Sequence, residues 1–140
     1  MIRKNLSFMI PINPVTKKNS QKIITNRTTH RPMIIPSPDY TRYEKDCGFF
    51  VKVPEKPIEH PVNVKCLFFR DSERRVDLTN LLEAIDDILV KYEVLKDDSF
   101  KYIYGHDGSR VYIDRENPRT EVYISWLEEG GQNDERTGSR

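Results

Sequence analysis

The acids of residues 77–98 are the side chains in this sequence best suited to chemistry. Seven Asp and Glu residues lie in this stretch against two lysines, and Arg74 and Arg75 come directly before the first acid, Asp77. Hard Mg²⁺ prefers carboxylate oxygens and water as ligands, and a substrate phosphate can complete its coordination shell. Carboxylates beside arginines are therefore the pattern that we expect of a divalent-metal site acting on phosphodiesters.

The same residues also have purely structural explanations. Asp77 is a good helix N-cap, because its carboxylate can accept from the backbone N–H of Thr79 or Asn80. Acids are ordinary on an exposed helix face, and Asp87 can pair with Lys91 at i,i+4 spacing. Composition alone leaves both interpretations open.

Charge is divided unevenly along the chain. Residues 1–75 contain 15 Lys/Arg and 7 Asp/Glu, a net of +8, whereas residues 76–140 contain 8 and 15, a net of −7. The two halves can simply pair within the domain. Alternatively, a basic surface binds a polyanion while the carboxylates bind a cation, and a nuclease needs both.

A helix is predicted to carry the acidic segment. Apolar residues recur at i, i+3, i+4, i+7, i+10, i+11 and i+14 from position 78, forming one stripe: Leu78, Leu81, Leu82, Ile85, Ile88, Leu89 and Tyr92. The opposite side presents Thr79, Glu83, Asp86 and Asp87. Because a helix of this length spans about 20 Å, the chain after it has to fold back to bring Asp98 near Asp77.

The remaining pattern predicts a small α+β protein. Alternation and turn residues predict strands at 5–12, 21–25, 33–35, 62–69 and 120–126, and a helix from the Ser37 N-cap to about Lys52. Residues 102–106 and 111–113 flank Asp107-Gly108-Ser109, which is a hairpin signal. We expect one domain over 1–127, a small mixed β-sheet with two helices on one face, followed by a disordered polar tail at 128–140.

Several classes of protein are disfavoured. No stretch approaches the roughly 20 apolar residues that span a bilayer, and the N-terminus is too polar for a secretory signal, so we expect a cytoplasmic protein with no membrane partner. Cys47 and Cys66 lack metal or redox spacing, which predicts reduced, buried thiols. No His-based triad is apparent, and His106-Asp107-Gly108-Ser109-Arg110 is interpreted first as a turn and second as a substrate contact.

The segment from Arg74 to Leu89 resembles the RusA family of Holliday-junction resolvases, which are common in bacteriophages and prophages. Members carry the run Arg-x-x-Asp-Leu-Asp-Asn-Leu-x-Lys-Ala-x-x-Asp-x-Leu, followed about ten residues later by a turn that ends in Asp-Asp. Here Val94-Leu95-Lys96-Asp97-Asp98-Ser99 is similar to that turn. The opening residues 11–19 resemble the family's Pro-rich, basic first loop, and the resemblance covers most of residues 5–126.

The resemblance implies a set of site residues. Asp77 matches the first catalytic Asp of the family and Asp98 the last, while Asn80 and Asp87 match its Asn and its mid-helix Asp. It also implies a bound Mg²⁺, with Mn²⁺ as the alternative. The expected metal ligands are Asp77, Glu83, Asp97 and Asp98.

Two positions depart from the family pattern. Thr79 replaces the second catalytic Asp, and Glu83 replaces the active-site Lys. These positions lie one helical turn apart, so a carboxylate lost at 79 can be restored from 83. The expected catalytic acids are therefore Asp77, Glu83 and Asp98.

The resemblance implies a metal-dependent endodeoxyribonuclease, bacterial or phage-encoded, that resolves four-way DNA junctions in recombination, repair or phage DNA processing. Two symmetric nicks need two active sites, so a twofold homodimer is expected. The alternatives are a catalytically impaired protein that binds junctions, and a nuclease for other branched DNA such as flaps. The residues expected to contact DNA are Lys17, Lys18, Asn19, Arg74, Arg75 and Arg110.

Overall fold

The computed structural model describes residues 1–17 and 21–129. Along the chain come β1 (Ile2–Ile10), β2 (Gln21–Thr25), β3 (Pro32–Pro36), α1 (Pro38–Cys47), β4 (Val62–Arg70), α2 (Leu78–Lys91), β5 (Ile103–Gly105), β6 (Arg110–Ile113) and β7 (Arg119–Glu128). The predicted α+β class, with two helices and a mixed sheet, is confirmed. Most of the predicted tail, from residue 130 on, lies outside the described residues.

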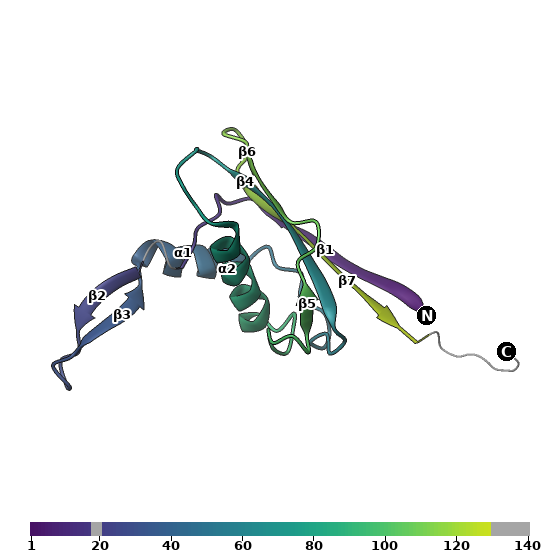
Figure 1. Ribbon diagram of the computed structural model, residues 1–140, viewed down its shortest axis with the longest axis horizontal. Coiled ribbons are helices and arrows are strands. Elements are labelled where there is room, and N and C mark those ends of the chain that lie inside the picture. Colours follow the sequence, from purple (N-terminus) through teal and green to yellow (C-terminus); the bar gives the residue numbers. More distant parts are fainter. Residues whose placement is uncertain (18–20, 130–140) are drawn as a thin grey trace, which may run out of the picture.

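One five-stranded sheet forms the body of the protein. Its order is β1-β7-β4, with β5 and β6 both on the outer edge of β4. The β1–β7 and β7–β4 pairs are antiparallel, whereas β5 and β6 run parallel to β4. Both helices lie on the same side of this sheet, while the β2–β3 hairpin extends away from it beyond α1 (Figure 1).

The core lies between the sheet and the two helices. Alternate residues of β4 are completely buried, as the period-2 pattern predicts: Val62, Val64, Cys66 and Phe68. The predicted stripe of α2 packs against them through Leu81, Leu82, Ala84, Ile85, Ile88 and Leu89.

Cys47 and Cys66 are free and buried, and burial raises the pKa of the Cys47 thiol to about 12. Neither helix of the described chain is long and apolar enough to cross a membrane.

The first helix begins where predicted but ends early. Ser37 caps it, since its hydroxyl accepts from the backbone N–H of Tyr40 at 3.3 Å. The helix ends at Cys47 and not near Lys52: Gly48 and Phe49 donate to carbonyls three residues back, at 3.2 and 3.1 Å. The ring of Tyr92 packs against Gly48 so closely that a Cβ there would lie 2.6 Å from the ring. The first strand also differs from its predicted bounds: it runs from residue 2 to 10, since its whole length pairs with β7.

The predicted hairpin around Asp107-Gly108-Ser109 is wrong. β5 and β6 do not pair with each other; both pair with β4, where Val62 is opposite Ile103 and Leu67 is opposite Arg110. The turn connects two strands that pair with the same edge of β4, and two side chains link the turn to β4. The Asn63 amide accepts from Asp107 N at 2.7 Å and donates to its carbonyl at 3.2 Å, while the Ser109 hydroxyl accepts from Cys66 N at 3.0 Å. Gly108 supplies the positive φ of 88° that the turn requires.

Candidate functional site

The outer face of α2 carries a cluster of interacting carboxylates. Burial raises the pKa of Asp86 and of Asp87, and the negative charges of Asp98 and Glu83 raise both further. The charges of Asp98 and of Glu83, which is one helical turn away, both act on these carboxyls. Asp98 therefore lies within electrostatic range of the middle of α2.

The segment after α2 is anchored by apolar side chains. Glu93 adopts a positive φ of 63°, where the chain leaves the helix. Val94 and Leu95 are then buried in the core, and Val94 N donates to Leu89 O at 2.9 Å. Because these two residues are fixed, the exposed pair Asp97 and Asp98 that follows is held near the helix.

The first loop reaches the same acidic face. Lys17 Nζ lies 3.5 Å from Asp87 Oδ2, with 39% of the lysine side chain and 30% of the aspartate side chain exposed. This predicted DNA contact is therefore paired with a carboxylate in the structure. Two further predicted contacts, Lys18 and Asn19, lie outside the described residues.

His106 pairs with the acidic face of α2, a contact that the sequence did not predict. Its Nε2 atom lies 2.9 and 3.0 Å from the two carboxylate oxygens of Asp86. The hydrogen bond with Asp86 raises the pKa of His106 despite its partial burial. Nothing in the sequence spacing signals this pair, because Asn63 and Ser109 determine where the turn that carries His106 lies.

Asp77 lies at the opposite end of the acidic face. It occupies the N-cap position of α2, but its side chain makes no capping hydrogen bond there, so capping does not explain this residue. Its carboxylate is 3.9 Å from Arg75 and about half exposed. The helix rises about 14 Å between positions 77 and 86. Asp77 is thus separated along the helix axis from Asp86 and Asp87, the two acids on which the charges of Glu83 and Asp98 act.

An arginine-lined pocket opens next to Asp77. Its volume is about 530 Å³, and its walls are the loop at 12–16, the outer side of α1 and the segment 70–76. Four arginines line it against two acids, Asp39 and Asp46: Arg42, Arg70, Arg74 and Arg75. Two of the three arginines predicted to contact DNA, Arg74 and Arg75, therefore share one pocket. The third arginine, Arg110, is exposed on β6 and does not line it.

The expected metal ligands fit Mg²⁺ or Mn²⁺ in their chemistry. They are oxygen donors. Burial mainly raises the pKa of Asp86 and Asp87, and the charges of Asp98 and Glu83, which a bound cation would neutralise, add to that rise. Within residues 1–17 and 21–129, however, no three His, Cys, Asp or Glu side chains form a group that could hold a metal ion. The four-residue set predicted from the sequence stays a prediction.

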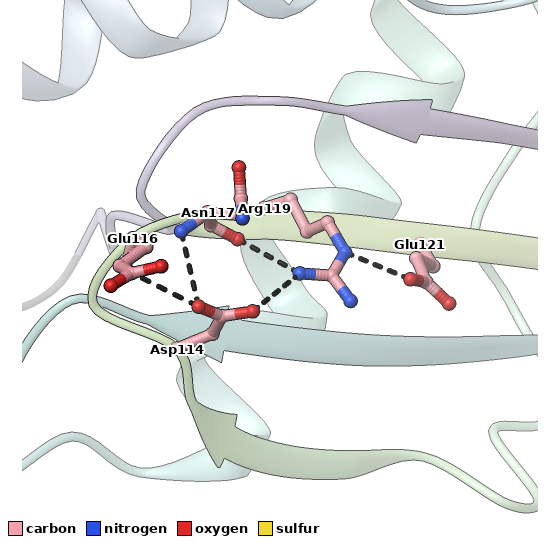
Figure 2. A network of polar contacts seen from close by, with 5 residues as sticks. All are labelled: Asp114, Glu116, Asn117, Arg119 and Glu121. Atoms are coloured by element: carbon pink, nitrogen blue, oxygen red, sulfur yellow. Dashed lines mark hydrogen bonds and ion pairs between the residues drawn. The ribbon is translucent and has the colours of Figure 1, made fainter.

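A second group of charges lies on the opposite face of the sheet and has a structural role. The Arg119 guanidinium bonds to Asp114 at 3.0 Å and to Glu121 at 2.9 Å, as Figure 2 shows. It also stacks on the Phe69 ring at 3.8 Å. The Arg119 hydrogen bond holds the pKa of Asp114 below its usual range. This arginine is neutralised by its partners and braces the β6–β7 turn.

No family model and no curated protein matches this chain. The resemblance of residues 74–99 to the RusA family stays a prediction that depends on those residues.

Proposed function

We propose that this chain is a metal-dependent endodeoxyribonuclease whose substrate is a four-way DNA junction. The observation that supports this most is the convergence of acids from two separate segments. The charges of Asp98, from the turn after α2, and of Glu83, on the helix, both act on Asp87. Repulsion among these acids costs stability, which the pairs of Asp86 with His106 and of Asp87 with Lys17 oppose. A cation brought to the cluster would turn that cost into binding energy.

The proposed roles follow from position and charge. Glu83 and Asp98, with the neighbouring Asp97, would hold Mg²⁺, which lowers the pKa of a bound water and neutralises charge at the reacting phosphate. Asp77 is outside this set, because the helix separates it from Asp86 by about 14 Å. Arg74 and Arg75 would bind phosphates of the strand to be cut and hold it beside the carboxylates. Cutting both strands symmetrically requires two sites, which favours a homodimer.

Binding of junctions without cleavage is the second candidate. Thr79 and Glu83 depart from the family pattern, and the described residues contain no closed set of three metal ligands. Both observations are compatible with a protein that retains the arginine pocket and has lost the chemistry.

A single cleavage assay distinguishes these functions. A synthetic four-way junction, a flap and a linear duplex, each end-labelled, are incubated with the protein in Mg²⁺, in Mn²⁺ or in EDTA. The proposal predicts paired nicks in the junction only when the metal is present. Junction binding with no cleavage of any substrate would establish the second candidate, and equal cutting of the flap would widen the substrate class to branched DNA in general.

The arginine pocket is tested through the salt dependence of binding. Replacing Arg74→Gln and Arg75→Gln together should reduce the slope of log affinity against log salt by about two, since each phosphate contact contributes about one. Arg3→Gln is the matched control, because Arg3 is exposed on β1 and does not line the pocket. An unchanged slope in the double variant would remove these arginines from the DNA interface.

A further inference from the structure

The β2–β3 hairpin stands apart from the body of the protein. It forms a sheet of its own, and its main contact with another element is between β3 and α1. Figure 1 shows this hairpin, a two-stranded β-ribbon, extending beyond α1 on the side away from the five-stranded sheet. Because an isolated two-stranded hairpin is marginally stable in water, this arrangement indicates that the ribbon acquires a partner.

Both faces of the ribbon expose large apolar side chains. On one face Ile23 pairs with Ile34, and these side chains are 75% and 62% exposed. On the other face Ile24 pairs with Met33, at 40% and 38%. A ribbon that is apolar on both faces is suited to insertion between two surfaces.

The tip of the ribbon is basic and internally braced. The Asn26 side-chain oxygen accepts from the backbone N–H groups of Thr28 and Thr29 at 2.8 and 2.9 Å, and Asn26 N donates to Arg31 O at 2.8 Å. These bonds fix the turn that carries Arg27 and Arg31, both of which are exposed. The tip therefore presents two guanidinium groups at a defined place.

The charge of this region favours one kind of partner. Residues 15–38 contain five Lys and Arg residues and no Asp or Glu. Two such ribbons would repel each other, whereas a polyanion would be attracted to both. The DNA major groove, about 12 Å wide, admits a two-stranded ribbon between two phosphate backbones. There, apolar side chains can contact bases while basic ones contact phosphates.

We propose that the β2–β3 hairpin is a DNA-binding arm that enters a groove of one duplex arm of the substrate. Arg27 and Arg31 contact phosphates, and Ile23 and Ile34 contact the bases. This inference takes its DNA partner from the proposed function, but it does not depend on cleavage. The arm adds a second contact with DNA, separate from the arginine pocket.

Two paired variants test the arm. Arg27→Gln with Arg31→Gln should reduce the salt slope of junction binding, measured in EDTA, by about two. Ile23→Thr with Ile34→Thr should lower the affinity roughly tenfold and leave the slope unchanged, because base contacts release no counterions. Threonine keeps strand propensity, and melting temperatures and circular dichroism verify the fold. The control is Ile2→Thr with Arg3→Gln, an exposed apolar and basic pair on β1.

The outcomes separate the arm from the proposed function. If both arm variants bind the junction like the control, the arm is wrong, even where the wild-type protein cuts DNA. If light scattering shows that the isoleucine variant changes the oligomeric mass while neither arm variant alters DNA binding, the ribbon is a contact between copies and the proposal is overturned. Arm-dependent binding by a protein that cuts no DNA would support the arm and contradict the nuclease.

Discussion

The imidazole of His106 donates from Nε2 to both carboxylate oxygens of Asp86, at 2.9 and 3.0 Å. The bond joins the end of β5 to the acidic face of α2. Only 13% of the Asp86 side chain and 28% of the His106 side chain are exposed, so water screens the pair incompletely. This contact locks the edge of the sheet to the helix that carries the candidate site.

Replacing His106→Gln should make the protein less stable in a pH-dependent way. The folded-state pKa of His106 is raised by its bond to Asp86, so the native state holds this proton more tightly than the unfolded chain does. The resulting stability is complete below about pH 6.5, the unfolded value, and is lost as the pH rises through the folded-state pKa. We expect a loss of about 1.5 kcal/mol at pH 5.5, the lower range for a charge-assisted bond.

Thermal unfolding of the wild type and this variant from pH 5.5 to 9 measures the effect. The difference between the two melting temperatures should narrow as the pH rises. A difference that is constant across this range, or that grows toward high pH, would show that the pair is not held by a protonated imidazole.

Replacing Asn63→Ala should release His106 without touching it. The Asn63 side chain makes two hydrogen bonds to Asp107, next to His106, and these hold the turn against β4. Their loss should cost about 1–2 kcal/mol and move the pKa of His106 toward its ordinary value. Titration of the His106 ring protons by NMR measures the pKa, and His60 provides an internal reference in the same spectra. A His106 titration that is unchanged in this variant would contradict the role given to Asn63.

Replacing Asp98→Asn should stabilise the protein slightly. Burial raises the pKa of Asp86 and Asp87, and the charge of Asp98 adds to that rise. Its removal should therefore lower both pKa values and relieve about 0.3 kcal/mol of repulsion at neutral pH. The gain should shrink as the pH falls through the raised pKa values, because protonated carboxyls do not repel. Carboxyl ¹³C titrations and melting curves measure the two effects. Asp97→Asn is the matched control, and an equal effect from that variant would show that Asp98 does not lie closer to the cluster.

Bound Mg²⁺ should raise the melting temperature of the wild-type protein. A ligand that binds only the folded state stabilises it, by about 1.4 kcal/mol at ten times its dissociation constant. The rise should be absent in Asp98→Asn and in Glu83→Gln. Sodium chloride at matched ionic strength controls for screening of the acidic face. A rise of equal size in the variants would place the bound ion elsewhere.

Long, strongly periodic elements could be predicted from the sequence. The stripe from Leu81 to Leu89 and the alternation from Val62 to Phe68 each have one solution that buries their apolar residues, and both elements are present as predicted. The predicted pairing at Asp107-Gly108 failed because a turn dipeptide signals a local change of direction and does not specify the partner strand. The two segments that flank the dipeptide, β5 and β6, both pair with the edge of β4 and not with each other.

The candidate site could be predicted only in part. Helix length required the chain to fold back if Asp98 was to approach Asp77. In the structure the charge of Asp98 acts on Asp86 and Asp87, which lie farther along α2. The difference arises because Val94 and Leu95 are buried beside the C-terminal half of α2, which fixes where the turn can reach. Contacts of this kind depend on tertiary packing, which no spacing in the sequence encodes.

The proposed metal site is tested by the single-turnover rate at which the protein cuts a four-way junction in Mg²⁺. If acids of α2 and of the following turn bind the metal together, Glu83→Gln and Asp98→Asn should each slow cleavage at least about a hundredfold. Junction affinity measured in EDTA should stay within about twofold of the wild-type value. Cleavage by either variant at the wild-type rate would contradict this account.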